Sequence, residues 1–384
     1  MSWIAAADVE TELARARRDD DLDRFLGLLG DEELFVPIHR DEAHQLAEQR
    51  VWSPAKVCCP HEGELSLQVF TRGAVPDLGD RVVFFSGDLD WAVRGLGTGE
   101  QLVFNRGTSG EWRVGASAVL GWLDANPHRV TAVEQQVERL HTASYGHLEG
   151  PVAHALACGA HQAVLAAEPW NLLGARCHDY VAEIRGLHDW WGISDAAGWR
   201  TAVDGLLGEN RAVTPGGLAL VLRARSGADL DPLAWVRLVS TWCAEHELAG
   251  QEDLLAAAVR RNVRYEQRLR ADGVLPPDGA AGSTLGWDLG RAVELVRWGL
   301  AVGHCDALTA ELLVLEAGSL ARRYHESWAE LSAGYVLGRV LALDDERFGE
   351  HYRTAVRVHH LLLEDPASPW SNLTFAAGGP EIRP

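Results

Sequence analysis

The chain has 384 residues, of which 47% are hydrophobic and 23% are charged, and these ordinary fractions exclude wholesale disorder. Its 55 acidic and 35 basic residues give a formal net charge of −20, which disfavours binding to nucleic acid or to anionic membranes. The length favours two domains, which we assign to residues 1–128 and 129–384.

Residues 1–128 mix helix and strand patterns. Apolar side chains over residues 10–29 have helical spacing, and a second helical pattern covers residues 114–123. Four short apolar runs between them are typical of strands, and they cover residues 34–38, 65–70, 82–85 and 102–104. We therefore expect a small α/β sheet domain.

Short strings in this domain resemble the N-terminal domain of the SseB family. They are Leu34–Pro37, which matches the family's strand ending in Val-Pro, and Val69–Thr71, which matches its "VFT" strand. Asn105–Val114 lies where the family has a turn beginning with Asn-Pro-Gly-Ser. The resemblance covers about 115 residues and implies an early helix followed by a sheet.

From about residue 130 the strand signals disappear, and Ala- and Leu-rich segments have helical periodicity. We predict helices near residues 131–140, 151–167, 172–188, 196–207, 230–247, 251–271, 288–303, 307–325, 327–343 and 346–363. Asp231 and Asp306 each precede one of these segments and can cap it. The fold class is therefore α+β, with a small N-terminal α/β sheet domain followed by a larger all-helical domain.

Three motifs rich in Trp, Gly and Arg mark the helical domain. They are Gly286–Arg291, Tyr324–Glu330 and Gly334–Arg339, and Leu187–Ile193 lies upstream of them. Their order is similar to that of the YbeU/YbeR-type family, a bacterial domain of unknown function with the number 1266. The resemblance spans about residues 150–345 and implies a helical domain without an assigned activity.

The candidate site is the set of polar and aromatic residues in these motifs: Trp287, Asp288, Arg291, Tyr324, Ser327, Trp328, Glu330, Tyr335 and Arg339. We expect the two stretches that carry Trp287 and Trp328 to meet inside one helical body, because large indoles are suited to pinning helix crossings. Gly334 and Gly338 share a helical face and would let another backbone approach.

Three interpretations of this cluster remain open. The favoured one is a buried structural ion-pair network, since buried Asp and Arg are usually retained in pairs. The second is a pocket in which Asp288, Arg291, Glu330 and Arg339 converge on a ligand. The third is an exposed face that binds a partner.

Candidates for metal or nucleophile chemistry are weaker. His154, Cys158 and His161 lie at i, i+4 and i+7, a spacing compatible with zinc if Cys177 or His178 approaches, but one continuous helix rarely supplies three ligands. Cys58–His61 lacks a second cysteine pair, and Gly95–Gly99 lacks a following helix that would bind phosphate. We predict no metal and no cofactor.

The leading functional hypothesis is a non-catalytic protein-interaction module, such as an immunity-like or accessory factor. Its acidity suits a basic protein partner, and its 15 tryptophans are available as anchors. The alternative is an enzyme or small-ligand binder with a pocket at Trp287, Asp288, Ser327 and Trp328. A homo-oligomer that packs through His147, His154 and His161 is a further alternative.

The cysteines, and the lack of an apolar segment long enough to cross a membrane, indicate the cellular compartment. The sequence has no secretory signal, and its six cysteines are scattered. We therefore expect reduced thiols and a cytoplasmic protein without membrane association.

Overall fold

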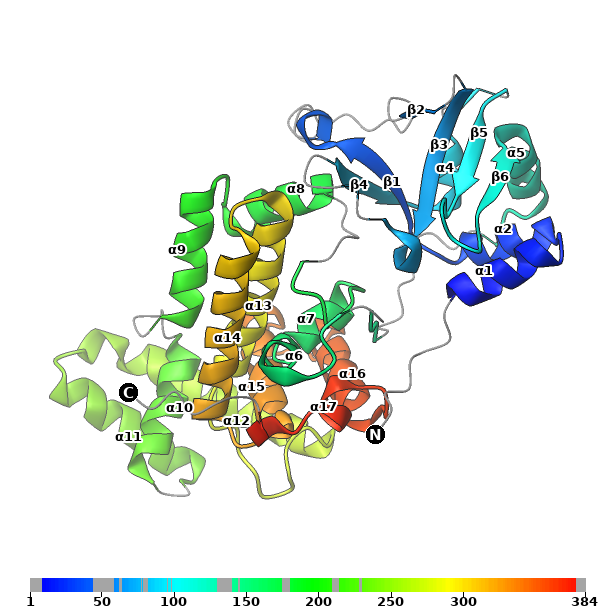
Figure 1. The fold of residues 1–384 in the computed structure, drawn as a ribbon. Coiled ribbons are helices and arrows are strands. Elements are labelled where there is room, and N and C mark those ends of the chain that lie inside the picture. The colour runs from blue at the N-terminus through cyan, green and yellow to red at the C-terminus, as the bar shows by residue number, and fades with distance from the viewer. Residues whose placement is uncertain are drawn as a thin grey trace.

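The structure is a computed structural model in which the strands gather at one end and the helices from α6 (Gly150–Ala157) to α17 (Pro369–Asn372) at the other (Figure 1). It describes residues 9–377, apart from residues 44–58, 62–63, 77, 79–81, 95, 98, 130–139, 144–145, 175–179, 209–213 and 228–229. The helix predicted near residues 131–140 therefore lies almost wholly outside the described residues.

The first helical segment is two helices, not the single one predicted over residues 10–29. Helix α1 (Val9–Arg18) ends where Asp20 adopts a positive φ of 53°. Helix α2 (Leu22–Gly30) begins after Asp21, whose carboxylate accepts a hydrogen bond from the backbone N–H of Arg24. The run of aspartates favours this break because an Asp side chain satisfies the free N–H groups at a helix start.

The strands form a mixed sheet in the order β4-β1-β3-β5-β6, with β2 also paired to β3. Neighbours β3 and β5 run parallel, whereas the other paired strands are antiparallel. The strands are β1 (Leu34–His39), β2 (Cys59–His61), β3 (Glu64–Thr71), β4 (Val82–Gly87), β5 (Gln101–Phe104) and β6 (Trp112–Gly115). All four predicted strands are confirmed, and β2 and β6 were not predicted.

Helices α4 (Leu89–Val93) and α5 (Ala116–Ala125) pack with this sheet. Helix α5 begins two residues after the start predicted at residue 114, because Val114 lies in β6 and pairs with Leu102 of β5. Along β1, Leu34 and Val36 belong to the main hydrophobic cluster, whereas Phe35 belongs to a smaller cluster with Phe70. This alternation buries apolar side chains on both faces of the sheet.

The remainder is helical, as predicted, and the α+β class is confirmed. Its helices are α6 (Gly150–Ala157), α7 (Ala160–Leu165), α8 (Tyr180–Trp191), α9 (Ala196–Leu207), α10 (Pro215–Ser226), α11 (Pro232–Glu245), α12 (Glu252–Ala271), α13 (Leu285–Val302), α14 (Ala307–Tyr324), α15 (Trp328–Leu343), α16 (Glu350–Glu364) and α17 (Pro369–Asn372). The predicted caps Asp231 and Asp306 both accept backbone N–H hydrogen bonds. None of the described helices is long and apolar enough to cross a membrane.

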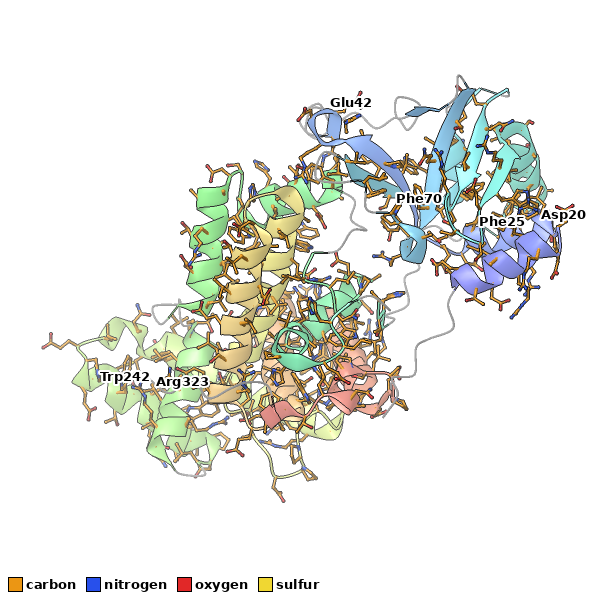
Figure 2. All side chains as sticks on the ribbon, viewed as in Figure 1. Asp20, Phe25, Glu42, Phe70, Trp242 and Arg323 are labelled. Carbon is orange, nitrogen blue, oxygen red and sulfur yellow. The ribbon has the colours of Figure 1, made fainter. Side chains whose placement is uncertain are left out.

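Two hydrophobic clusters organise the helices. The first includes residues of α6, α7, α9, α13 and α14, and it continues into the sheet end of the molecule. The second is built around α10, α11, α12 and α15. Helices α15 and α16 contribute buried residues to both clusters, and α13 belongs to the first cluster while its Trp287 packs against the second. Most of the motif residues lie on α13 and α15. Figure 2 shows the side chains that fill the space between these elements.

Candidate functional site

Helices α13 and α15 cross in direct backbone contact. A Cβ added at Gly286 would overlap the carbonyl oxygen of Leu331, and one at Gly334 would lie 2.7 Å from the carbonyl oxygen of Ser283. A Cβ at Gly338 would overlap the side chain of Trp287. The predicted close approach at Gly334 and Gly338 is thus confirmed, and Gly286 supplies the facing side of the crossing.

Ser327 and Glu330 serve as the N-terminal cap of α15. The Ser327 hydroxyl accepts a hydrogen bond from the N–H of Glu330 at 3.1 Å, and the Glu330 carboxylate accepts one from the N–H of Glu326 at 2.7 Å. A Ser-x-x-Glu sequence favours such a reciprocal cap at a helix start, although here the carboxylate accepts from the residue before Ser327 and not from Ser327 itself. Glu330 and the half-exposed Tyr324 line neither of the cavities beside Trp287 that are described below, so Glu330 does not converge there with Asp288, Arg291 and Arg339 as the second interpretation predicted.

The two signature tryptophans do not form one cluster. The indole of Trp328 stacks on Trp370 with ring centroids 5.6 Å apart, and its N–H donates to the carbonyl of Leu373 at 2.7 Å. Trp287 instead packs edge-on against Tyr335 and belongs to the second hydrophobic cluster. The two stretches that carry them do meet where α13 and α15 cross, as predicted, but the indoles themselves are apart, because Trp287 lies beside Gly338, well along α15 from Trp328.

A cavity of about 840 Å³ opens beside Trp287, and we call it the aromatic cavity. Four tryptophans line it, together with three arginines and several carboxylates. The tryptophans are Trp190, Trp191, Trp287 and Trp298, and the arginines are Arg72, Arg291 and Arg339. Arg72 comes from the sheet end of the chain, so both ends of the molecule contribute to the wall.

The arginines of the aromatic cavity differ in their partners. Arg72 pairs with Glu33, and Arg291 pairs with Asp288 while its guanidinium lies 4.9 Å from the ring centroid of Trp287. The predicted pairing of Asp288 with Arg291 is thus confirmed.

Arg339 lies over the same indole at 5.6 Å, and no ion pair joins it to a carboxylate within the described part of the chain. Its buried Nε has no hydrogen-bond partner there either. Burial raises the pKa of Tyr335, and the neighbouring Arg339 opposes that rise.

A buried ion triad lies behind this wall, and the sequence analysis did not identify it. Arg297, 1% exposed, pairs with Glu168 at 3.0 Å and with Glu294 at 3.1 Å. It also donates to the carbonyls of Pro169 and Leu172. Burial acts to lower the pKa of Arg297, but the carboxylates outweigh it and the pKa is raised. The ion-pair interpretation therefore applies best to residues outside the signature.

The histidines considered as zinc ligands have other roles. Helix α6 ends before Cys158 and α7 begins after Gly159, so no continuous helix carries the three residues. His154 hydrogen-bonds to the carbonyl of Phe375 at 2.7 Å, and His161 to the hydroxyl of Ser332 at 2.8 Å.

Among the described residues, no group of His, Cys, Asp and Glu is placed to hold a metal ion. Both His154 and His161 are buried within the chain, so they cannot form a face for a second copy, whereas His147 is exposed. Cys58, Cys177 and His178 lie outside the described residues.

Ser332 stands between two buried imidazoles, His161 and His359, at 2.8 and 2.7 Å. A hydroxyl has one hydrogen to donate, so at least one imidazole must donate its own N–H. Burial, with a smaller contribution from His360, lowers the pKa of His359 to about 4, and burial also lowers the pKa of His154 to about 4. Both residues therefore stay neutral in the folded protein near neutral pH.

We expect stability to fall as the pH drops from 6.5 towards 5. The unfolded chain takes up protons at His154 and His359 in this range while the folded chain does not, because their pKa values are lowered from 6.5 to about 4. The two neutral histidines make their full contribution to the free energy of unfolding above pH 6.5. Below pH 6.5 each of them lowers that free energy by up to about 1.4 kcal/mol per pH unit. Urea unfolding at pH 7.5, 6 and 5 measures the slope. His359→Asn should flatten it, whereas equal slopes for the two proteins would contradict this origin.

One family model matches a little under half of the chain. Residues 186–375 match the model of a family described as a protein of unknown function, DUF1266. This part of the chain is thus similar to that family, as predicted, whereas its YbeU/YbeR-type character stays a prediction. No curated protein and no solved structure matches the chain. The resemblance of the N-terminal part to the SseB family stays a prediction.

Proposed function

We propose that the protein binds a small organic anion with a flat aromatic body in the aromatic cavity. The observation that carries this proposal is Arg339, which has no carboxylate partner in the described chain but lies at a cavity of about 840 Å³ lined by tryptophan. Cavities that hold small molecules usually measure about 300–1,000 Å³. A ligand carboxylate or phosphate would pair with the guanidinium.

The charge arrangement supports an anionic ligand. Four carboxylates of the described residues line the cavity. Glu168 and Glu294 pair with Arg297, Glu33 pairs with Arg72, and Glu183 helps to raise the pKa of the buried Arg297. Arg291 is likewise neutralised by Asp288. Arg339 is left as the cation that gains a partner when an anion binds, so the anion need not displace an existing pair.

The tryptophans support an aromatic body for the ligand. Trp190 at the cavity is 78% exposed, and Trp191, Trp287 and Trp298 are partly exposed. Indole faces stack on flat rings, and covering an exposed indole removes much apolar area from water. The ring would lie among these side chains while its acidic group reaches Arg339.

We expect 2-naphthoate to bind the protein and Arg339→Gln to weaken that binding at least about ten-fold, because one charge-assisted hydrogen bond is lost. Isothermal titration calorimetry measures both affinities. The neutral analogue 2-naphthol should bind the two proteins alike. Arg347→Gln is the matched control, because Arg347 is exposed near the end of α15 and lines neither cavity. Equal naphthoate affinity for Arg339→Gln and the unaltered protein would contradict the proposal.

The protein-interaction hypothesis stays a prediction, as do the basic partner and the cytoplasmic location. A homo-oligomer that packs through all three histidines is disfavoured, because His154 and His161 are buried. Several of the tryptophans expected to serve as anchors are buried in the core: Trp170, Trp199, Trp235, Trp328 and Trp370. The aromatic cavity therefore has more specific support within the described chain than a flat interaction face has.

A further inference from the structure

We propose that a second cavity, on the other side of Trp287, binds an aliphatic carboxylate of the fatty-acid class. This cavity measures about 700 Å³ and lies among α10, α12, α13 and α15. We call it the aliphatic cavity. The inference is independent of the ligand proposed for the aromatic cavity, because a different arginine and different apolar side chains carry it.

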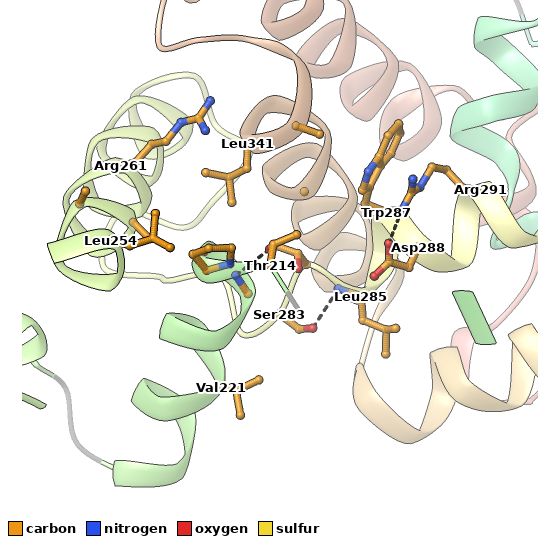
Figure 3. A pocket seen from close by; sticks show the side chains of 18 of the residues that line it. Thr214, Val221, Leu254, Arg261, Ser283, Leu285, Trp287, Asp288, Arg291 and Leu341 are labelled. Carbon is orange, nitrogen blue, oxygen red and sulfur yellow. Dashed lines mark hydrogen bonds and ion pairs between the residues drawn. The ribbon is translucent and has the colours of Figure 1, made fainter. Parts of the chain in front are cut away.

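The walls of the aliphatic cavity are chemically unlike those of the aromatic cavity. Leucine and valine side chains line it, and Trp287 is its one aromatic wall residue among the described residues. Figure 3 shows Leu254 and Leu341 on one side, and Trp287 with the Asp288–Arg291 pair on the other. Flexible aliphatic walls fit a methylene chain better than they fit a flat ring, which gains most from aromatic neighbours.

Apolar surface is left uncovered here. Leu254 is 51% exposed, and Val221, on the facing helix α10, is 36% exposed. Neighbouring Ala257 and Ala258 on α12 are small, so they leave width between the helices. A bound alkyl chain would remove these leucine and valine side chains from water.

One positive charge in the cavity lacks a counter-charge. Glu346 pairs with Arg264 at 3.1 Å, and Asp288 pairs with Arg291. Arg261 makes no ion pair within the described chain, and its buried Nε has no hydrogen-bond partner there. Its guanidinium lies 5.8 Å from the ring centroid of Tyr265. Because Glu346 pairs with Arg264, which lies outside the lining, Arg261 is left as the cation that an acidic head group such as that of a fatty acid would pair with.

The test uses the full chain with decanoate and its neutral analogue decanol, both below micelle-forming concentrations, in isothermal titration calorimetry. We expect decanoate to bind, Arg261→Gln to weaken its binding at least ten-fold, and decanol to bind both proteins alike. Arg260→Gln is the matched control, because Arg260 is its exposed neighbour on α12 and does not line the cavity. This control should leave both affinities unchanged.

A second variant tests the location. Ala257 is exposed on α12, so Ala257→Phe leaves the core intact while its ring fills the cavity mouth, and it should abolish binding of both probes. Circular dichroism checks that each variant is folded. No decanoate binding, or binding that Arg261→Gln and Ala257→Phe leave unchanged, overturns the inference. Arg339→Gln should leave decanoate binding intact, so failure here is distinguishable from failure of the aromatic cavity proposal.

Discussion

Replacing Arg297 with methionine should lower the free energy of unfolding by about 3–5 kcal/mol, the usual cost of removing one partner from a buried ion pair. The side chain is 1% exposed, and its guanidinium pairs with two carboxylates while donating to two backbone carbonyls. Methionine has similar length but cannot satisfy any of these four groups. Glu294, which is 2% exposed, would then hold its charge in an apolar surrounding without that cation.

Urea unfolding followed by far-UV circular dichroism measures the loss. The matched control is the triple variant Glu168→Gln, Glu294→Met and Arg297→Met, which removes the charges together and should recover most of the lost stability. A single variant as stable as the unaltered protein would show that the triad does not hold this part of the fold.

The second large effect is expected at the crossing of α13 and α15. Gly286→Ala should destabilise the protein by about 1–3 kcal/mol or more, since overpacking forces shifts in a filled core. The added methyl group meets the carbonyl oxygen of Leu331 and would lie 2.8 Å from the backbone nitrogen of Tyr335. Backbone atoms cannot rotate away as a flexible side chain can, so the two helices would have to separate.

Gly205→Ala is the matched control for this variant. Gly205 also lies within a helix, α9, but a Cβ there meets no atom within 4 Å. Alanine should stabilise that position by up to about 1 kcal/mol through its higher helix propensity. Thermal unfolding of both variants should therefore give shifts of opposite sign, and a Gly286→Ala protein as stable as Gly205→Ala would refute close packing at the crossing.

Local patterns account for what could be predicted of the fold. Capping and periodicity located α11 and α14 because Asp231 and Asp306 act within one turn of sequence. Helix α10 was missed because its start, Pro215 to Gly217, has the composition of a loop. The structure shows Thr214 capping it and Pro215 at its first position, where proline is tolerated.

Interactions at the candidate site could be predicted only where the two interacting residues are close in sequence. The Asp288–Arg291 pair follows from helical spacing, and so does the cap formed by Ser327 and Glu330. Arg297 with Glu168, and His161 with Ser332, join residues more than a hundred positions apart. No periodicity connects such residues, because tertiary packing alone brings them together. The one local signal of the buried ion triad was the presence of Glu294 and Arg297 three residues apart in an apolar helix.

Trp287 and Arg291 line both cavities, so the two cavities share these two side chains. Any molecule that tilts the indole on one side changes the shape offered on the other side. The two occupancies must then be thermodynamically coupled, and each would alter the affinity of the other by the same factor. The coupling free energy between the two sites is the same whichever cavity is filled first.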